Sequence, residues 1–110
     1  MARHHFVVLS NPVTGREDEY NDWYSNRHLD DVLQVPGFVA AQRFRLSPMS
    51  PAQESPYGYL CVYEVESDDL DATKAAIEAA AEGMVISGAL DQEDLFACYY
   101  TPITERKTAE

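Results

Sequence analysis

Short apolar runs and strict alternation along the chain indicate four β-strands. The first run is rich in β-branched residues and stops at the turn pair Asn11-Pro12. A stretch with three prolines and three serines, residues 47–56, predicts a loop between the second and third strands. The four predicted strands cover residues 5–10, 38–46, 57–65 and 95–103.

Two other segments repeat their apolar residues near the period of an α-helix. Residues 17–35 begin with three acidic side chains, which suit the positive end of a helix dipole, and stop before Pro36. Residues 67–82 begin with a residue type that caps helices, and Gly83 is placed to end them. The segment 84–94 has no regular period and is expected to be irregular.

The order of these elements is β-α-β-β-α-β. This order is typical of the α+β class, and in particular of the ferredoxin-like fold, in which one four-stranded antiparallel sheet carries two helices on one face. We expect a single domain over residues 1–110, in which residues 105–110 form a loose tail.

A single helix layer leaves the second face of the sheet open. In a monomer that face is normally polar, yet the first strand is apolar on both faces, with Val7 and Leu9 opposite Phe6 and Val8. An open apolar face of this kind is a partner site. We therefore predict a homodimer that packs sheet to sheet into an α/β barrel.

Composition narrows the function classes. The chain has 8 basic and 19 acidic side chains, a formal net charge of −11 and a pI near 4.5. Nucleic acids and anionic membranes attract basic proteins, so we expect neither as a partner. The apolar run 6–9 is too short for a signal peptide, and no glycine-rich phosphate loop occurs. A cytoplasmic protein without a cofactor is expected.

His28 is the first candidate for chemistry, because imidazole titrates near neutral pH. It follows Tyr24 by four residues and Tyr20 by eight, so the three share a helix stripe that Trp23 flanks. That stripe should face the sheet and surround the imidazole with aromatic rings. One interpretation is a general acid or base that burial keeps neutral; the other is a structural histidine hydrogen-bonded to a carbonyl.

Seven tyrosines offer hydroxyl groups that could bind a substrate oxygen. Strand parity predicts that three of them face the helices together with Phe44 and Phe96: Tyr59, Tyr63 and Tyr100. A slip of one residue in the last strand would exchange Tyr100 for Tyr99.

Parity also assigns faces to charged residues. His5 opens the first strand, and we expect it to point toward the helices with Val7. A metal pair of His5 and His28 has no identifiable third ligand, so no metal site is predicted. Arg43 and Arg45 are expected on the face away from the helices, paired with acidic groups there or across a dimer.

Residues 19–29, followed by 35–38, carry a recognisable pattern. Their sequences, EYNDWYSNRHL and VPGF, resemble the helix signature of the dimeric α/β-barrel superfamily, particularly its EthD-like branch. In that branch a Trp-Tyr pair, a helical histidine and a Pro-Gly before the second strand recur in this order.

The resemblance implies a small homodimer whose two sheets close into a shared barrel. Proteins similar to this include cofactor-free monooxygenases, polyketide cyclases, lactone isomerases, dehydratases and lyases, and they bind aromatic or polyketide-like ligands between sheet and helices. It favours His28 as the catalytic residue and matches His5 to a pocket histidine of the cyclases. The second catalytic histidine of those cyclases has no counterpart here.

We therefore expect a small cofactor-independent enzyme, a lyase or isomerase that acts on an aromatic or apolar molecule. His28 would move the proton and Tyr59 would stabilise the developing oxyanion. A non-catalytic, homodimeric small-molecule-binding or stress-related protein is the alternative, and a cofactor-free monooxygenase is a further one. The expected substrate-binding residues are His5, Tyr20, Trp23, Tyr24, Tyr63 and Tyr100.

Overall fold

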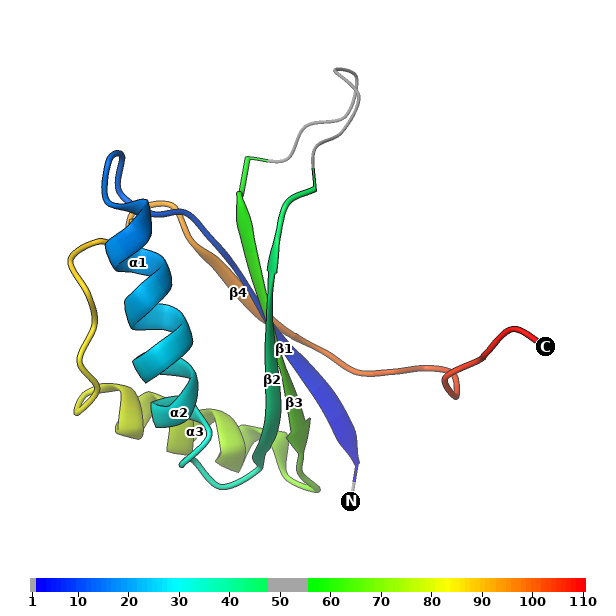
Figure 1. Ribbon diagram of the computed structural model, residues 1–110. Coiled ribbons are helices and arrows are strands. Elements are labelled where there is room, and N and C mark those ends of the chain that lie inside the picture. The colour runs from blue at the N-terminus through cyan, green and yellow to red at the C-terminus, as the bar shows by residue number, and fades with distance from the viewer. Residues whose placement is uncertain (1, 48–55) are drawn as a thin grey trace.

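The computed structural model of the chain describes residues 2–47 and 56–110. Its elements follow the predicted order, with the first helical segment divided into three consecutive parts (Figure 1). Most of the predicted loop 47–56 falls outside the described residues. The elements are β1 (Arg3–Ser10), α1 (Glu17–Trp23), η1 (Tyr24–His28), α2 (Leu29–Val32), β2 (Phe38–Arg45), β3 (Tyr59–Glu66), α3 (Leu70–Ala81) and β4 (Phe96–Tyr100).

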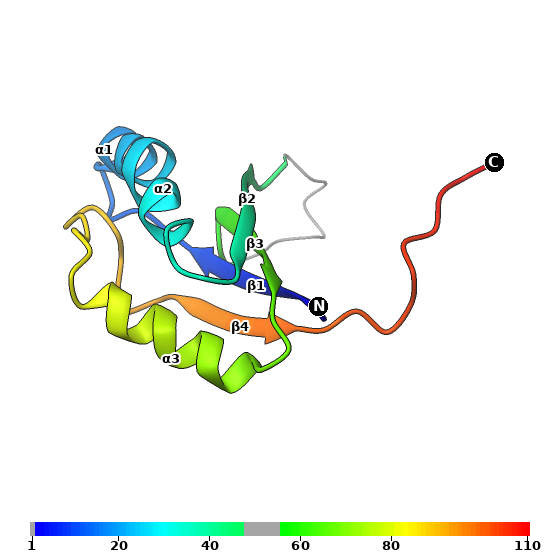
Figure 2. The ribbon, with the colours of Figure 1, turned by 90° about the horizontal axis from the view of Figure 1, so that it is seen from below.

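The four strands form one sheet in the order β2-β3-β1-β4, and every neighbouring pair is antiparallel. The helices lie together on one side of this sheet, while the exposed chain after β4 extends away from them (Figures 1 and 2). This arrangement is ferredoxin-like, so the predicted fold class is confirmed. Within residues 2–47 and 56–110, no helix is long and apolar enough to cross a membrane.

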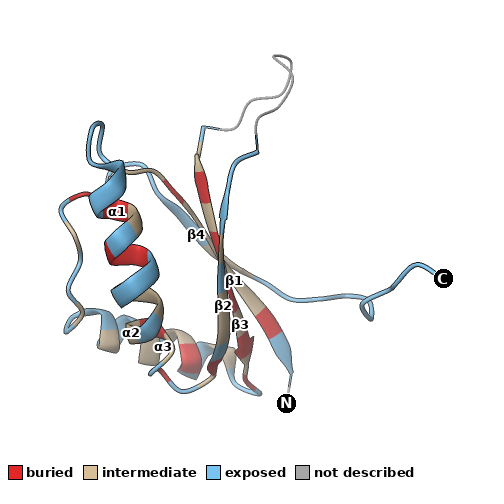
Figure 3. Ribbon diagram, viewed as in Figure 1, coloured by how far each residue is buried: buried red, intermediate tan, exposed pale blue. Residues whose placement is uncertain are grey.

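β3 supplies the centre of the core. Every second residue of this strand is buried against the helices, and the intervening ones are half-buried on the other face (Figure 3). This is the alternation of a strand with one face on a core. The predicted helix-facing side of β3 is therefore correct, and its buried side chains are Tyr59, Cys61, Tyr63 and Val65.

On β1 the helix-facing residues are not the predicted ones. In the antiparallel register Phe6 lies opposite Tyr63 and Val8 opposite Cys61, so these four side chains share the helix side. His5 lies opposite Glu64 on the other face. The predicted placement of His5 toward the helices is wrong, because β1 is apolar on both faces and alternation alone does not say which face is the core.

A β-bulge in β2 reverses the parity of the strand. Phe38 pairs with Val65, but the register then shifts by one residue, and Arg43 pairs with Cys61. Phe38 and Arg43 therefore both face the helices, whereas Phe44 is 42% exposed on the open face. The predicted outward orientation of Arg43 and Arg45 is wrong for this reason, since Arg45 pairs with Tyr59 on the helix side.

β4 has the alternative register. Tyr99 lies opposite Phe6 on the helix side, and their rings stack with centroids 4.5 Å apart. Tyr100 consequently points to the open face, where it is 56% exposed, and Phe96 is 47% exposed there. The expectation that Tyr100 faces the helices is wrong.

Candidate functional site

A cavity of about 320 Å³ lies between the sheet and the helices, on the side of η1 that faces α3. β1, β3 and β4 form its floor, η1 and α3 form two walls, and residues 84–92 close one end. The lining is almost entirely apolar and consists of Phe6, Val8, Trp23, Tyr24, His28, Val32, Tyr63, Ile77, Glu78, Ala81, Met84, Ile86, Leu90, Gln92, Leu95 and Ala97. Its size and apolar lining are typical of sites for small organic ligands.

The π-helical turn η1 explains how Trp23 and His28 come to face each other. The amide of Leu29 donates to the carbonyl of Tyr24, five residues back instead of four. In an α-helix, residues five apart are separated by about 140° around the axis, and the wider π-turn reduces that separation. The Trp23 and His28 rings stack with centroids 4.6 Å apart, and Tyr24 meets the imidazole edge-on at 5.1 Å.

The imidazole of His28 is half-buried among these rings. Burial lowers its pKa below the ordinary value of 6.5, and the nearby charge of Asp31 opposes this only in part. The neutral ring is therefore the prevailing form at neutral pH. Nδ1 is buried and has no hydrogen-bond partner in the described part of the chain. A structural histidine held by a carbonyl at that atom does not fit this geometry.

Tyr63 provides a second polar group in the cavity. Its hydroxyl is buried near the Tyr24 hydroxyl and the Cys61 thiol, but it makes no well-formed hydrogen bond with a described residue. Burial raises the pKa of Tyr63 and that of Tyr24, so both phenols stay protonated. A protonated phenol in an apolar cavity is a hydrogen-bond donor suited to an oxygen atom on which charge develops.

Of the predicted site residues, the structure brings Trp23, Tyr24 and Tyr63 together with His28. Tyr20 of α1 and Tyr59 of β3 lie in contact on the other flank of the first helical segment. The Tyr20 hydroxyl shares a 2.6 Å hydrogen bond with Ser10 Oγ.

Tyr59 was predicted to act together with His28, but its hydroxyl is hydrogen-bonded to residues on the other flank of α1. Its hydroxyl donates to the carboxylate of Glu17 and accepts a hydrogen bond from Asn21 Nδ2. It does not line the His28 cavity, and neither do His5 and Tyr100, which lie on the open face of the sheet. The expected grouping of these residues with His28 is therefore corrected.

Several lining residues come from the segment 84–92, whose conformation no sequence pattern predicted. Trp23 Nε1 donates to the carbonyl of Val85 at 2.8 Å, which ties this segment to α1. The amide of Val13 donates to the carbonyl of Ala89 at 2.6 Å. These contacts join residues far apart in the sequence, so local periodicity could not reveal them.

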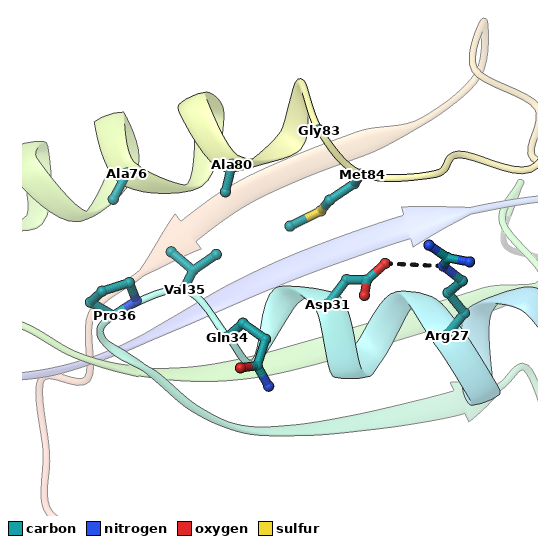
Figure 4. A pocket seen from close by; sticks show the side chains of 9 residues that line it. All are labelled: Arg27, Asp31, Gln34, Val35, Pro36, Ala76, Ala80, Gly83 and Met84. Atoms are coloured by element: carbon teal, nitrogen blue, oxygen red, sulfur yellow. Dashed lines mark hydrogen bonds and ion pairs between the residues drawn. The ribbon is translucent and has the colours of Figure 1, made fainter.

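A second hollow, of about 380 Å³, adjoins the cavity between α2 and α3 (Figure 4). The ion pair of Arg27 and Asp31, at 3.4 Å, lies along one wall, and small side chains of α3, Ala76 and Ala80, form the other. Met84 lines both spaces. The thioether of Met84 is thus part of the partition between them.

Comparison with known proteins gives matches at the level of structure. No family model matches the sequence, and no curated protein matches it. The structure is similar to an EthD-like protein from Ralstonia eutropha, with a TM-score of 0.69 and 14% identity over 96% of each chain. It is similar to an EthD family protein from Bacillus halodurans, with a TM-score of 0.63 and 18% identity over 94% of this chain and 100% of that one.

A third similar structure is a candidate monooxygenase from Shewanella loihica, with a TM-score of 0.58 and 20% identity over 94% of this chain and 96% of that one. At these identities the likeness shows the fold alone. It confirms, at that level, the resemblance to EthD-like proteins that residues 19–38 suggested.

Proposed function

We propose that the protein is a cofactor-independent enzyme that transfers a proton within an aromatic or apolar small molecule, as a lyase or isomerase. The observation that carries this proposal is that two residues lining one apolar cavity each hold a buried polar atom without a partner among the described residues: His28 Nδ1 and the Tyr63 hydroxyl oxygen. Buried polar groups are normally hydrogen-bonded, and exceptions occur at functional sites.

In this mechanism the neutral imidazole of His28 accepts a proton from a carbon or hydroxyl of the substrate. The electron pair left behind moves onto a substrate oxygen, to which Tyr63 donates a hydrogen bond in place of the predicted Tyr59. His28 then returns its proton, either to another carbon, which gives isomerisation, or to a leaving group, which gives elimination. The apolar walls exclude water, and this strengthens both interactions.

Two other functions use the same cavity. A non-catalytic binding protein would need only the apolar walls and the aromatic stack on His28. A cofactor-free monooxygenase is supported by the fold shared with the candidate monooxygenase from Shewanella loihica. Proton transfer is preferred because an apolar carrier gains nothing from a buried imidazole nitrogen without a partner, whereas a base requires one.

The open face of the sheet supports the proposal that the protein works as a homodimer. It exposes large apolar side chains on β2 and β4, namely Phe44, Phe96 and Tyr100. A contiguous apolar face is typical of an interface. Sedimentation at micromolar concentration should give twice the mass of 12.4 kDa, and a monomer alone would contradict this part of the proposal.

The test of the enzyme is a substrate screen followed by a pair of histidine variants. Aromatic and apolar carbonyl compounds would first be screened for thermal stabilisation and then for turnover. His28→Ala should lower kcat by about 10²–10⁴-fold, the usual contribution of a positioned general base. His5→Ala, the same change on the other face, should leave kcat within about twofold. Turnover that survives His28→Ala within tenfold would overturn the assignment.

The same assay separates catalysis from simple binding. The enzyme should show a kcat/KM that falls as His28 becomes protonated at acid pH. A binding protein should retain its ligand in His28→Ala and show no turnover with any compound that it binds.

A further inference from the structure

The opposite flank of α1 carries a charged cluster that the proposed reaction does not use. Arg43 on β2 reaches up to the helix, where Nη1 donates to Ser25 Oγ at 2.8 Å and Nη2 donates to Asn21 Oδ1 at 2.9 Å. Its guanidinium also lies over the rings of Tyr24, Tyr20 and Tyr59, with Cζ at 4.5, 5.3 and 5.4 Å from their centroids.

Among the described residues, these contacts leave the positive charge of Arg43 without an anion. Both hydrogen-bond acceptors are neutral, and within the described ranges no carboxylate lies within ion-pair distance of Arg43. Arg3, Arg16 and Arg27, which are more exposed, each have an acidic partner. Partly burying a cation without a counter-ion is unfavourable, and it is unexpected in a chain with 19 acidic side chains and only 8 basic ones.

Arg45 lies on the same face, two residues along the strand. Arg43 pairs with Cys61 and Arg45 with Tyr59 in the sheet register, so both side chains point to the helix side. Arg45 also makes no ion pair with the residues in 2–47 and 56–110. Together they form one side of a hollow of about 310 Å³. No acidic residue of the described ranges lines this hollow, whose lining is Asn21, Ser25, Arg43, Phe44, Arg45 and Tyr59.

We propose that this hollow binds the carboxylate of a small organic acid. A guanidinium has five N–H groups and Arg43 uses two of them on the helix, so others remain to bind a planar carboxylate in a fork. Arg45 supplies the second charge. The Ser25 hydroxyl accepts from Arg43 and keeps its own proton for the anion.

The site is independent of the proposed reaction. Tyr24 separates the two regions, since its ring lies beneath Arg43 and the same residue lines the His28 cavity. Loss of catalysis on changing His28 therefore says nothing about anion binding at Arg43, and the two proposals can fail separately.

The experiment follows the arginine side-chain Nε–H signals of the ¹⁵N-labelled full chain by NMR during titration with sodium acetate. Sodium chloride at the same ionic strength is the reference, and sodium phosphate tests whether the site recognises charge alone. Acetate should shift the signals of Arg43 and Arg45 in a saturable manner and leave that of Arg27 unchanged. Arg45→Gln should weaken acetate binding, read at Arg43, by about tenfold.

Lys107→Gln is the matched control, because it removes the same charge from the exposed tail and should leave acetate binding unchanged. Arg45 is exposed, so its variant should fold normally even if Arg43→Gln does not. The proposal is overturned if chloride gives the same shifts, if only phosphate saturates, or if Arg45→Gln has no effect. Signals that respond to protein concentration and ignore acetate would assign the arginines to a carboxylate of a second copy, which also overturns it.

Discussion

The two flanks of the first helical segment differ in whether their polar side chains are hydrogen-bonded within the chain. On the arginine flank, which comprises Tyr20, Asn21, Arg43 and Tyr59, each side chain makes at least one hydrogen bond within the chain, and the rings pack against a cation. On the cavity flank, Tyr63 and His28 keep buried polar atoms without partners among the described residues. One flank is thus held by hydrogen bonds within the chain, which leave only some N–H groups of Arg43 for the proposed carboxylate. The other flank keeps buried polar atoms that have no partner among the described residues.

This difference has an energetic meaning. A satisfied buried hydrogen bond contributes roughly 1 kcal/mol to stability, whereas an unsatisfied buried polar atom costs about 1–3 kcal/mol. Removing a polar atom on the arginine flank should therefore lower the free energy of unfolding of the protein. Removing one on the cavity flank should leave that free energy unchanged or raise it.

The largest effect is expected at Arg43. Arg43→Ala should lower the free energy of unfolding by about 2–4 kcal/mol, because it removes two charge-assisted hydrogen bonds and the contact with three tyrosine rings. Urea unfolding followed by circular dichroism measures this. Arg45→Ala, without those contacts, should change stability by no more than about 0.5 kcal/mol. Equal effects of the two variants would mean that the helix contacts contribute little.

A matched pair of hydroxyl deletions compares the flanks directly. Tyr20→Phe should cost about 1–2 kcal/mol, because it leaves Ser10 Oγ buried without its partner. Tyr63→Phe should leave stability unchanged or raise it slightly, because its hydroxyl has no well-formed hydrogen bond to a described residue that would be lost. The same unfolding assay applies to both variants. A Tyr63→Phe loss as large as that of Tyr20→Phe would contradict the assignment of the cavity flank as unsatisfied.

The sequence was sufficient for the element order and for part of the cavity. β3 alternates between buried and half-buried positions, and its helix-facing side could be predicted because tyrosines and Cys61 recur at every second residue. His28, Trp23 and Tyr24 could be grouped from helical spacing alone. Their actual contact depends on the π-turn, which brings together residues five apart.

The remaining strands could not be assigned from parity. β1 is apolar on both faces, so Phe6 and His5 were equally compatible with facing the helices until the register with Tyr63 was known. In β2, the bulge near Val39 shifts every later residue to the other face, and nothing in the local alternation marks it. The arginine flank was missed for that reason alone.

A smaller effect is expected where the irregular segment closes the cavity. Trp23→Phe keeps an aromatic ring against His28 but removes the hydrogen bond to the carbonyl of Val85. Stability should fall by about 1 kcal/mol. Amide hydrogen exchange should quicken within residues 84–90 and stay unchanged in β3. Uniformly faster exchange would show that the hydrogen bond of Trp23 stabilises the whole core and not residues 84–90 alone.

The smallest effect concerns the protonation of His28. Because burial disfavours the charged ring, the folded chain binds this proton at lower pH than the unfolded chain, whose histidine titrates near 6.5. The free energy of unfolding is therefore not reduced by His28 above about pH 6.5. It falls as the pH decreases from 6.5 toward the lower folded pKa, by no more than about 1.4 kcal/mol per pH unit. NMR titration of the ring protons should give a midpoint below 6.5, and Asp31→Asn should lower it further, since that carboxylate favours the charged ring. A titration midpoint of His28 at or above 6.5 would show that the imidazole is exposed to water. The cavity flank would then not hold a buried imidazole without a partner, and the difference between the two flanks would be contradicted.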